Sequence, residues 1–251
     1  MIADRLRWMG TVVRHTRNPF PIFREWAGSQ RKPYRVVSRD GAVFEIRPGR
    51  GDWYIYMETL LRSDYLSLGQ RLEKGATVVD IGANVGGFSV FAARRIGPSG
   101  RVVAVEPDPD SLQQLEVNAT LNPGYARIQT LACAVGGKRG EAVLHSDANA
   151  AWSSLHRLET RSKTTDLTVR VLTLEDVFEQ AHIERCNYLK IDTEGSEYEI
   201  IAALTPEIAS RIEQITLELH DVPGHNRAEI YSKLAALGYN LKPGTLTYAF
   251  R

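Results

Sequence analysis

The chain contains 251 residues, 43% of them hydrophobic and 24% charged, and its formal net charge at pH 7 is +1. A chain of this length forms one large domain or a domain with an extension, and its composition excludes disordered, collagen-like and mucin-like proteins. A net charge this close to zero gives no reason to expect a nucleic-acid partner.

The first 23 residues and the two cysteines bear on where the protein works. Those residues lack the continuous apolar core of a secretory signal, and no apolar run reaches the roughly 18 residues that span a bilayer. Cys133 and Cys186 lie in apolar surroundings without metal-ligand spacing, which predicts two buried thiols in a reducing compartment. We therefore expect a cytoplasmic protein without a transmembrane segment.

The first 35 residues are basic, with eight Lys and Arg against two acids. Apolar residues at helical spacing predict an amphipathic helix over residues 2–15. Three interpretations of it stay open: packing on the main domain or on a second subunit as a homodimer, contact with a membrane surface, or a solvated arm. Two alternating segments around Asp40-Gly41 predict a hairpin, and residues 52–72 have a helical pattern. We predict that residues 1–72 form a helical and hairpin extension and that residues 73–251 form the main domain.

From Ala76 onward, strand and helix patterns alternate. Strands are predicted at 77–81, 101–105, 128–135, 188–191 and 215–219, helices at 86–95, 110–121, 196–204 and 227–237, and a closing pair of strands at 239–242 and 245–250. Alternation of this kind predicts an α/β fold: a Rossmann-like, mostly parallel seven-stranded sheet with helices on both faces and an antiparallel closing strand. Residues 146–166 are polar and lack a period, which predicts a long lid or binding loop.

The segment VVDIGANVGGFSVFAARRIG, residues 78–97, places a strand, a tight turn and a helix in the order of a nucleotide-binding crevice. Gly82 is expected to turn the chain off the strand. Gly86 and Gly87 have no Cβ, so we expect a ligand to touch the backbone there, where free N–H groups suit an anion or a polar edge. A purely structural turn is the alternative.

The second strand of this unit ends at Glu106, 24 residues after Gly82. A carboxylate at this tip is placed to accept hydrogen bonds from both ribose hydroxyls of an adenosine. Pro107 ends the strand, and Asp110 or Ser111 is expected to cap the next helix.

The turn itself indicates which adenosine ligand fits. A dinucleotide fingerprint reads G-x-G-x-x-G, but Asn84 stands at the second glycine, where its side chain crowds a pyrophosphate, and Asp80 would repel one. A ligand with an ammonium group and no phosphate fits better. S-adenosylmethionine is such a ligand: we expect its ammonium at Asp80, directly or through water, and its carboxylate at backbone N–H groups near residues 84–87.

Several motifs follow one another between residues 76 and 220. They are VVDIGANVGGFSVFAAR, VVAVEPDP, NATLN, ACAVGGKRGEAVL, WSSL, NYLKIDTEGSEYEII and ITLELH. On these the chain resembles the class I S-adenosylmethionine-dependent methyltransferases, and more narrowly the FkbM family, for which the combination with LKIDTEGSE is the specific signal. The preceding RPGRGDWYIYMETLLRSDYL also resembles what precedes these motifs in members tied to polysaccharide and natural-product pathways.

The resemblance implies a Rossmann-like sheet and methyl transfer to a hydroxyl oxygen of a small molecule, such as a sugar or a natural product. It also implies the cofactor residues: Asp80, Gly82, Ala83, Asn84 and Gly86 around the methionine moiety, Phe88 and Ser89 at the start of the helix beneath it, Glu106 at the ribose, Pro107 and Asp108 beside the adenine, and Cys133, Ala134 and Val135 around the adenine ring.

Acidic residues gather at the ends of the fourth and fifth predicted strands. Asp192 ends one strand and is followed by Glu194, while Glu218 and His220 share a face at the end of the other. Methyl transfer to a hydroxyl benefits from a general base. We predict a catalytic group of Asp192, His220 and Glu194, with Asp192 as base or orienting group and His220 as its partner.

Alternatives to this assignment stay open. Glu194 and Glu197 would simply cap a helix N-terminus, or Asp192, Glu218 and His220 would hold a divalent metal that lowers the pKa of the acceptor. Lys190 would neutralise the acids. For the whole protein, the rivals are a methyltransferase-like scaffold without turnover and a nicotinamide-dependent oxidoreductase.

Four further histidines, and Trp152 in the polar segment, have less definite roles. Trp152 either stacks on a sugar or pins the loop. The histidines are predicted to be surface or loop residues: His145, His156, His182 and His225.

Overall fold

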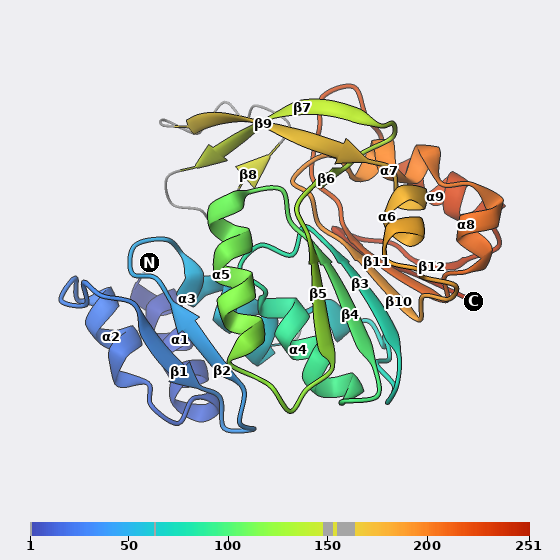
Figure 1. Ribbon diagram of the computed structural model, residues 1–251. Helices are drawn as coiled ribbons and strands as arrows, with labels where there is room; N and C mark the ends of the chain where they lie inside the picture. Colours follow the sequence, from blue (N-terminus) through green and yellow to red (C-terminus); the bar gives the residue numbers. More distant parts are fainter. Residues whose placement is uncertain (1, 63, 148–152, 155–163) are drawn as a thin grey trace.

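The computed structural model describes residues 2–62, 64–147, 153–154 and 164–251, and Figure 1 shows their arrangement. A seven-stranded sheet lies at the centre, in the order β12-β13-β11-β10-β3-β4-β5. Its strands are β3 (Thr77–Ile81), β4 (Arg101–Val105), β5 (Arg127–Leu131), β10 (Tyr188–Ile191), β11 (Gln214–Glu218), β12 (Asn240–Lys242) and β13 (Leu246–Phe250). The first five are parallel, whereas β13 pairs antiparallel with β11 and β12. The predicted Rossmann-like sheet with an antiparallel closing strand is confirmed.

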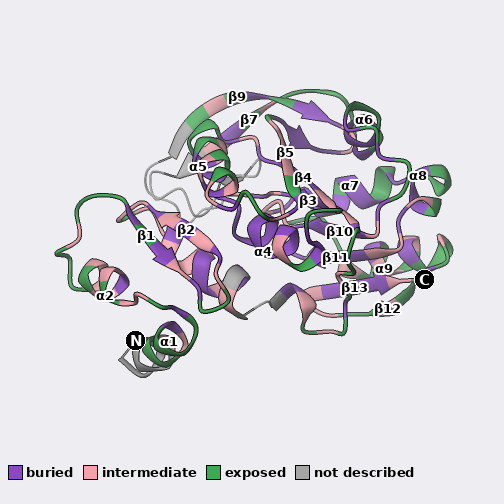
Figure 2. Ribbon diagram, turned by 60° about the horizontal axis from the view of Figure 1, so that its bottom comes forward, coloured by how far each residue is buried: buried purple, intermediate pink, exposed green. Residues whose placement is uncertain are grey.

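The central strands are apolar along most of their length because helices cover both faces of the sheet. Val78 and Val102 point to one face, where they share a buried cluster with α4 (Gly87–Ile96) and the N-terminal segment. Val79 and Val103 point to the other face and pack with four helices of the C-terminal half. These are α6 (Leu174–Gln180), α7 (Glu197–Ala203), α8 (Pro206–Ser210) and α9 (Arg227–Ala236). Figure 2 shows the central strands and α4 as buried.

The helix α5 (Pro109–Thr120) begins with a side-chain cap at the tip of β4. The Asp108 carboxylate accepts hydrogen bonds from the N–H groups of Asp110 and Ser111, at 2.9 and 3.0 Å. We expected Asp110 or Ser111 to be the cap. The cap lies earlier because Pro109, which has no N–H to satisfy, occupies the first helical position. None of the described helices has the length and apolar content needed to cross a membrane.

The N-terminal segment contains α1 (Ile2–His15), α2 (Phe20–Trp26), a hairpin of β1 (Tyr34–Val37) and β2 (Val43–Ile46), α3 (Asp52–Ile55), the π-helix η1 (Tyr56–Arg62) and the 3₁₀ turn η2 (Asp64–Leu66). The helix over residues 2–15 and the hairpin were predicted. The continuous helix expected over residues 52–72 is instead broken. Within it, the Thr59 hydroxyl donates to the carbonyl of Ile55 at 2.6 Å, which competes with the regular helical ladder.

The N-terminal segment packs directly on the central sheet's helices. Val12, Ile22 and Phe44 are fully buried in the same cluster as α4. The side-chain amides of Asn118, on α5, and Asn122, just after it, accept hydrogen bonds from two N–H groups of β2, at 2.8 and 3.0 Å. Of the three interpretations of this segment, packing on the main domain is the one that the structure shows; a contact with a second subunit stays a prediction.

A second sheet, of order β6-β9-β7-β8, lies beyond the end of β5, at the top of Figure 1. It consists of β6 (Ala134–Val135), β7 (Gly140–Asp147), β8 (Ser153–Ser154) and β9 (Thr164–Leu172). The loop predicted over residues 146–166 is therefore wrong at both ends, because β7 and β9 pair antiparallel up to Asp147 and Thr164. Polar side chains along the ends of both strands concealed the period of two. Trp152 and His156 lie outside the described residues.

Candidate active site

A cleft opens at the carboxyl ends of the parallel strands, where ligands of such sheets bind. It encloses about 980 Å³, part of it open to solvent, which is the size of a small-molecule site. Most of the predicted site residues line it: Gly82, Ala83, Asn84, Phe88, Glu106, Pro107, Cys133, Ala134, Val135, Asp192, Glu194 and Glu218. Five predicted residues do not line it: Asp80, Gly86, Ser89, Asp108 and His220.

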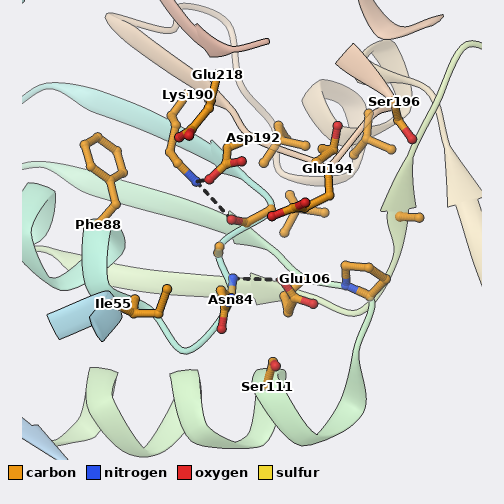
Figure 3. A pocket seen from close by; sticks show the side chains of 18 of the residues that line it. Ile55, Asn84, Phe88, Glu106, Ser111, Lys190, Asp192, Glu194, Ser196 and Glu218 are labelled. Atoms are coloured by element: carbon orange, nitrogen blue, oxygen red, sulfur yellow. Dashed lines mark hydrogen bonds and ion pairs between the residues drawn. The ribbon is translucent and has the colours of Figure 1, made fainter. Parts of the chain in front are cut away.

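The cleft has two sides, which Figure 3 shows with their side chains. We call them the β4 side, with Asn84 and Glu106, and the β10 side, with Lys190, Asp192 and Glu218. Lys190 also donates a hydrogen bond to the carbonyl oxygen of Gly82, in the turn after β3. The two sides therefore differ in charge and in the elements that build them.

On the β4 side, Glu106 lies at the tip of β4 and is 6% exposed. Its two carboxylate oxygens accept hydrogen bonds from the N–H groups of Asn84, at 2.8 Å, and Asp108, at 2.9 Å. Burial raises the pKa of Glu106 to about 7. Because each carboxylate oxygen has two lone pairs, each can accept one further hydrogen bond from a ligand. The strand-tip position is as predicted, and the contact with a ribose stays a prediction.

The remainder of the β4 side is apolar. Cys133, Ala134 and Val135 line the cleft and are at most 4% exposed. Burial raises the pKa of the Cys133 thiol to about 11, so it is a neutral, space-filling group at physiological pH. Such a wall suits a flat, apolar ring face.

The bare backbone after β3 is explained by packing within the protein. A Cβ on Gly82, whose φ is +75°, would overlap with the carbonyl oxygen of Asp192. A Cβ on Gly87 would overlap with the hydroxyl of Thr59, and one on Gly86 would press against α5. The prediction that a ligand touches the backbone at Gly86 and Gly87 is therefore corrected: η1 and α5 fill that space.

The N–H groups of this turn are also used within the protein. The Asn84 N–H binds Glu106, the Val85 N–H donates to the Asn84 side chain at 2.7 Å, and the Gly86 N–H donates to the Ala83 carbonyl at 2.9 Å. The expected binding of a ligand carboxylate by these three groups does not fit this structure. Asn84 has a φ of +51°, a conformation that asparagine tolerates better than most residues.

Asp80 lies behind the cleft wall and is fully buried. The Ser89 hydroxyl donates to it at 2.6 Å, and the Lys190 ammonium lies 3.1 Å from its Oδ1. Lys190 also donates to the Gly82 carbonyl at 2.9 Å. Burial alone would lower the pKa of Lys190, but the charges of Asp80 and Asp192 raise it, so Lys190 is an ammonium. Direct contact with a ligand ammonium, as predicted for Asp80, is not available because Lys190 and Ser89 occupy its carboxylate.

On the β10 side, two carboxylates meet one phenol. The Tyr65 hydroxyl oxygen lies 2.8 Å from Oδ2 of Asp192 and 2.8 Å from Oε2 of Glu218. The Lys190 ammonium lies 3.4 Å from the same Asp192 oxygen. Asp192 thus sits at the tip of β10 with its charge balanced by Lys190 and its position fixed by Tyr65.

Tyr65 itself is held on every side and is 4% exposed. The Tyr188 hydroxyl donates to its backbone carbonyl at 2.7 Å. Its ring meets Phe88 edge to face at 5.4 Å, and the Lys190 ammonium lies 5.1 Å from its centroid. Burial and the two neighbouring carboxylates raise the pKa of Tyr65, so its hydroxyl keeps its proton.

The turn after β10 contains a residue with a positive φ and is held by a buried carboxylate. Glu194 lines the cleft with a φ of +56°, one of three positive values among the described non-glycine residues. Such conformations cost free energy and gather at functional sites. Glu197 is fully buried and accepts hydrogen bonds from the N–H groups of Thr193 and Gly195. These two N–H groups belong to the turn before α7 and not to the helix, so Glu197 holds the turn rather than capping the helix, and Glu194 lines the cleft.

Comparison with known proteins places this arrangement in a family. The family model described as "Methyltransferase FkbM domain" matches residues 80–241, from β3 to β12. The 31-O-demethyl-FK506 methyltransferase FkbM of Streptomyces tacrolimicus is 30% identical over 199 residues, which are 68% of this chain and 75% of that protein. The chain belongs to the FkbM methyltransferase family.

Two further proteins are similar to this chain, each over a different share of its own length. The AMB antimetabolite synthetase AmbE of Pseudomonas aeruginosa is 27% identical over 201 residues, which are 67% of this chain but 9% of that synthetase. The crystal structure of methyltransferase FkbM from Methylobacillus flagellatus aligns with a TM-score of 0.47 and 14% identity, over 93% of this chain and 59% of that one. Family membership confirms the predicted class, an S-adenosylmethionine-dependent methyltransferase, and sets aside the nicotinamide-dependent alternative.

In this FkbM methyltransferase, His220 does not have the surroundings of a general base. Its Nδ1 lies 3.2 Å from Oε1 of Glu197, and its Nε2 lies 3.9 Å from Glu194. Burial alone would lower the pKa of His220, but Glu197, Asp192 and Glu194 raise it to about 9. The ring is therefore an imidazolium at neutral pH. The predicted partnership with Asp192 is corrected to an ion pair with Glu197.

The structure changes the set of residues that could hold a metal ion, because Glu197 takes the place predicted for Glu218. Glu218 is held by Tyr65, and the described acids and histidines whose ligand atoms come within 4.8 Å of one another are Asp192, Glu197 and His220. An imidazolium carries hydrogens on both nitrogens and ligates no metal until it loses one. In its protonated state this group does not fit a divalent ion, and metal dependence stays a prediction.

The sequence analysis missed several residues that line the cleft. Among them is Tyr65, which contacts Asp192 and Glu218. Ile55, Glu58, Thr59 and Tyr65 reach the cleft from the N-terminal segment. The spacing of strand-end motifs does not find them, because they lie on α3, η1 and η2 rather than at strand tips. The aromatic residues at 53–56 and Tyr65 fitted a helical pattern. That pattern does not indicate which of these side chains faces the cleft. Their placement needed the tertiary structure.

Proposed function

We propose that this protein transfers the methyl group of S-adenosylmethionine to a hydroxyl oxygen of a small molecule. The observation that carries the proposal is the pairing, within one cleft, of Glu106 at the tip of β4 with Asp192 at the tip of β10. Glu106 can accept hydrogen bonds from two ribose hydroxyls, and Asp192 can accept the proton of an alcohol. The name of the relative from Streptomyces tacrolimicus, a 31-O-demethyl-FK506 methyltransferase, supports oxygen as the acceptor atom.

The proposed arrangement of the cofactor follows from the two sides of the cleft. The adenine packs against the apolar wall of Cys133, Ala134 and Val135, the ribose binds Glu106, and the methionine part extends past Asn84 towards the β10 side. The sulfonium then faces the carboxylates of that side, which stabilise its positive charge.

Transfer is an in-line displacement, so the acceptor oxygen must lie close to the methyl carbon and opposite the sulfur. Asp192 accepts the hydroxyl proton as the new carbon–oxygen bond forms. The carbon–sulfur bond breaks with its electron pair staying on sulfur, and the sulfonium becomes a neutral thioether. The positive charge of the cofactor and the negative charge of Asp192 disappear in the same step.

The charges on the β10 side favour an uncharged acceptor. Asp192, Glu194 and Glu218 line the cleft there, and Glu58 lines it from η1. Lys190 is the one basic residue among its described lining residues. Lys190 is already paired with Asp80 and Asp192. An anionic acceptor would enter a site with more carboxyl groups than ammonium groups, whereas a polyhydroxylated neutral molecule would find hydrogen-bond acceptors. We therefore propose a neutral sugar unit or a neutral natural product as the acceptor class.

Calorimetry with S-adenosylhomocysteine tests the cofactor part. We expect a dissociation constant in the micromolar range and at least tenfold weaker binding by Glu106→Gln. Absence of measurable heat at submillimolar ligand would contradict the proposal. A non-catalytic scaffold would bind the ligand equally well, so turnover needs its own measurement.

A transfer screen with radiolabelled methyl donor tests turnover and the acceptor class together. Neutral hexosides, the matching hexuronates and neutral macrolides with free hydroxyls form the panel. We expect label in neutral members, with at least tenfold lower kcat/KM for a hexuronate than for the matching hexoside. Label in the hexuronates alone would overturn the acceptor class, and no label with any acceptor despite cofactor binding would favour the scaffold.

A further inference from the structure

The two contacts of Tyr65 on the β10 side fix the number of hydrogens there. Its hydroxyl oxygen lies 2.8 Å from a carboxylate oxygen of Asp192 and 2.8 Å from one of Glu218. Each of these hydrogen bonds needs one hydrogen, and a phenol supplies one. If both carboxylates were ionised, one of them would face a lone pair of the hydroxyl oxygen of Tyr65, a buried residue. A second hydrogen must therefore lie on Asp192 or Glu218.

The surroundings indicate which carboxyl group carries that hydrogen. The Lys190 ammonium lies 3.4 Å from Asp192 and stabilises a negative charge on it. Burial and the neighbouring charge of Asp192 raise the pKa of Glu218, while Tyr65, His220 and Lys190 act in the opposite direction. Of the groups that face Glu218, Lys190 lies on β10 and Asp192 just after it, His220 follows β11, and Tyr65 lies on η2. Lys190 is also paired with Asp80. The balance places the hydrogen on Glu218.

We propose that Glu218 is protonated in the resting protein and that Glu218, Tyr65 and Asp192 form a directed hydrogen-bond chain in the catalytic centre. Glu218 donates to Tyr65, and Tyr65 donates to Oδ2 of Asp192. The other oxygen of Asp192 stays available for the acceptor hydroxyl. The chain orients Asp192 and limits its basicity, so Tyr65 and Glu218 are positioning residues for the base; this role rests on the proposed function.

Through this hydrogen-bond chain, the N-terminal segment takes part in the proposed chemistry. Tyr65 lies 127 residues before Asp192 and 153 residues before Glu218. Its backbone is bonded to Tyr188 and its ring lies against Phe88, so the phenol cannot move without disturbing the sheet. The residues predicted as an extension, 1–72, thus complete the centre that the main domain begins.

Infrared difference spectroscopy of the protein alone tests the protonation of Glu218. The spectrum of Glu218→Gln is subtracted from that of the wild type at pH 7.5, in H₂O and in D₂O. We expect a carbonyl band of a protonated carboxyl group in the wild type that moves in D₂O. It should move again when the protein carries ¹³C-glutamate, but not when it carries ¹³C-aspartate. Glu106, whose pKa is about 7, contributes to both spectra and cancels.

The control is Glu229→Gln, an exposed glutamate on α9, which should give no such band. A difference band that follows the aspartate label, or no band at all, overturns the proposal. If Glu218→Gln does not fold, a titration of glutamate-labelled wild type replaces it: glutamic acid must persist above the pH at which Glu106 ionises. These spectra need neither cofactor nor acceptor, so their result is separate from the calorimetric test of the proposed function.

Discussion

The two sides of the cleft differ in how far apart their residues lie in the sequence. The β4 side is formed mainly by one strand–turn–helix unit and the strand tip after it, between residues 80 and 111, with three residues near 134. The β10 side joins the tips of β10 and β11 to Tyr65, across 127 and 153 residues. A local unit can be recognised from spacing alone, whereas a site assembled from distant segments depends on how those segments pack.

The two sides also treat their carboxylates differently. Glu106 is bonded only to backbone N–H groups among its described hydrogen bonds, and burial raises its pKa to about 7. Asp192 lies beside an ammonium and a phenol. The first environment suits a group that exchanges hydrogen bonds with a neutral ribose. The second suits a group that must be an anion before transfer and an acid after it.

The largest expected effect separates chemistry from cofactor binding. Asp192→Asn removes the base on the β10 side, and we expect kcat to fall by about 10³-fold. Binding of S-adenosylhomocysteine should change less than threefold, because the β4 side is untouched. Initial rates with labelled methyl donor and an acceptor from the screen, together with calorimetry, measure both quantities.

The matched control for that variant is Glu218→Gln. A protonated glutamic acid and a glutamine both donate one hydrogen bond to Tyr65, so transfer should stay within about threefold of the wild type. The opposite pattern, an active Asp192→Asn and an inactive Glu218→Gln, would exchange the roles of the two carboxyl groups.

The second prediction concerns the point where the two sides touch. Gly82→Ala places a Cβ against the carbonyl of Asp192 and strains a φ of +75°. We expect a loss of about 3 kcal/mol or more in the free energy of unfolding. Gly28→Ala has a similar φ of +71° with open space around it, so it should lose only about 1 kcal/mol. Chemical denaturation of both variants gives the comparison, and equal losses would mean that backbone strain, not the Asp192 contact, requires glycine at residue 82.

That glycine shows what the sequence could and could not predict. The strands at 77–81, 101–105 and 188–191 were predicted to the residue because their apolar runs end at an acid, a glycine or a proline. The reason for the glycines was misassigned, since a bare backbone looks the same whether a ligand or a neighbouring chain segment fills the space. The strands β7 and β9 were missed at their polar ends, and Tyr65 had no local pattern that marks a site residue.

The third prediction concerns how the affinity of the β4 side for the cofactor depends on pH. If ionised Glu106 accepts the ribose hydroxyls better than the acid does, binding should follow its ionised fraction, which rises through a pKa of about 7. The affinity for S-adenosylhomocysteine should be about tenfold higher at pH 8 than at pH 6. Glu106→Gln should bind more weakly at both values and lose this dependence. A wild-type affinity that is flat over this range would remove Glu106 from the ribose.

A small effect on activity is also expected for His220→Gln. An imidazolium paired with Glu197 takes no proton from the acceptor, so kcat should stay within about fivefold of the wild type. A larger loss, together with inactivation by a chelator and rescue by Mg²⁺, would instead support the metal alternative.

The contribution of His220 should appear in stability. Its pKa in the folded protein is about 9, above its ordinary value of 6.5, so the stabilisation is complete below pH 6.5 and disappears as the pH rises through 9. The free energy of unfolding of the wild type should fall over this interval by on the order of 1 kcal/mol. Glu106, whose pKa is about 7, contributes to this fall in both proteins, so His220→Gln should show a smaller fall than the wild type. A parallel pH dependence in both proteins would mean that the ion pair with Glu197 does not form in solution, and His220 would again be a candidate base on the β10 side.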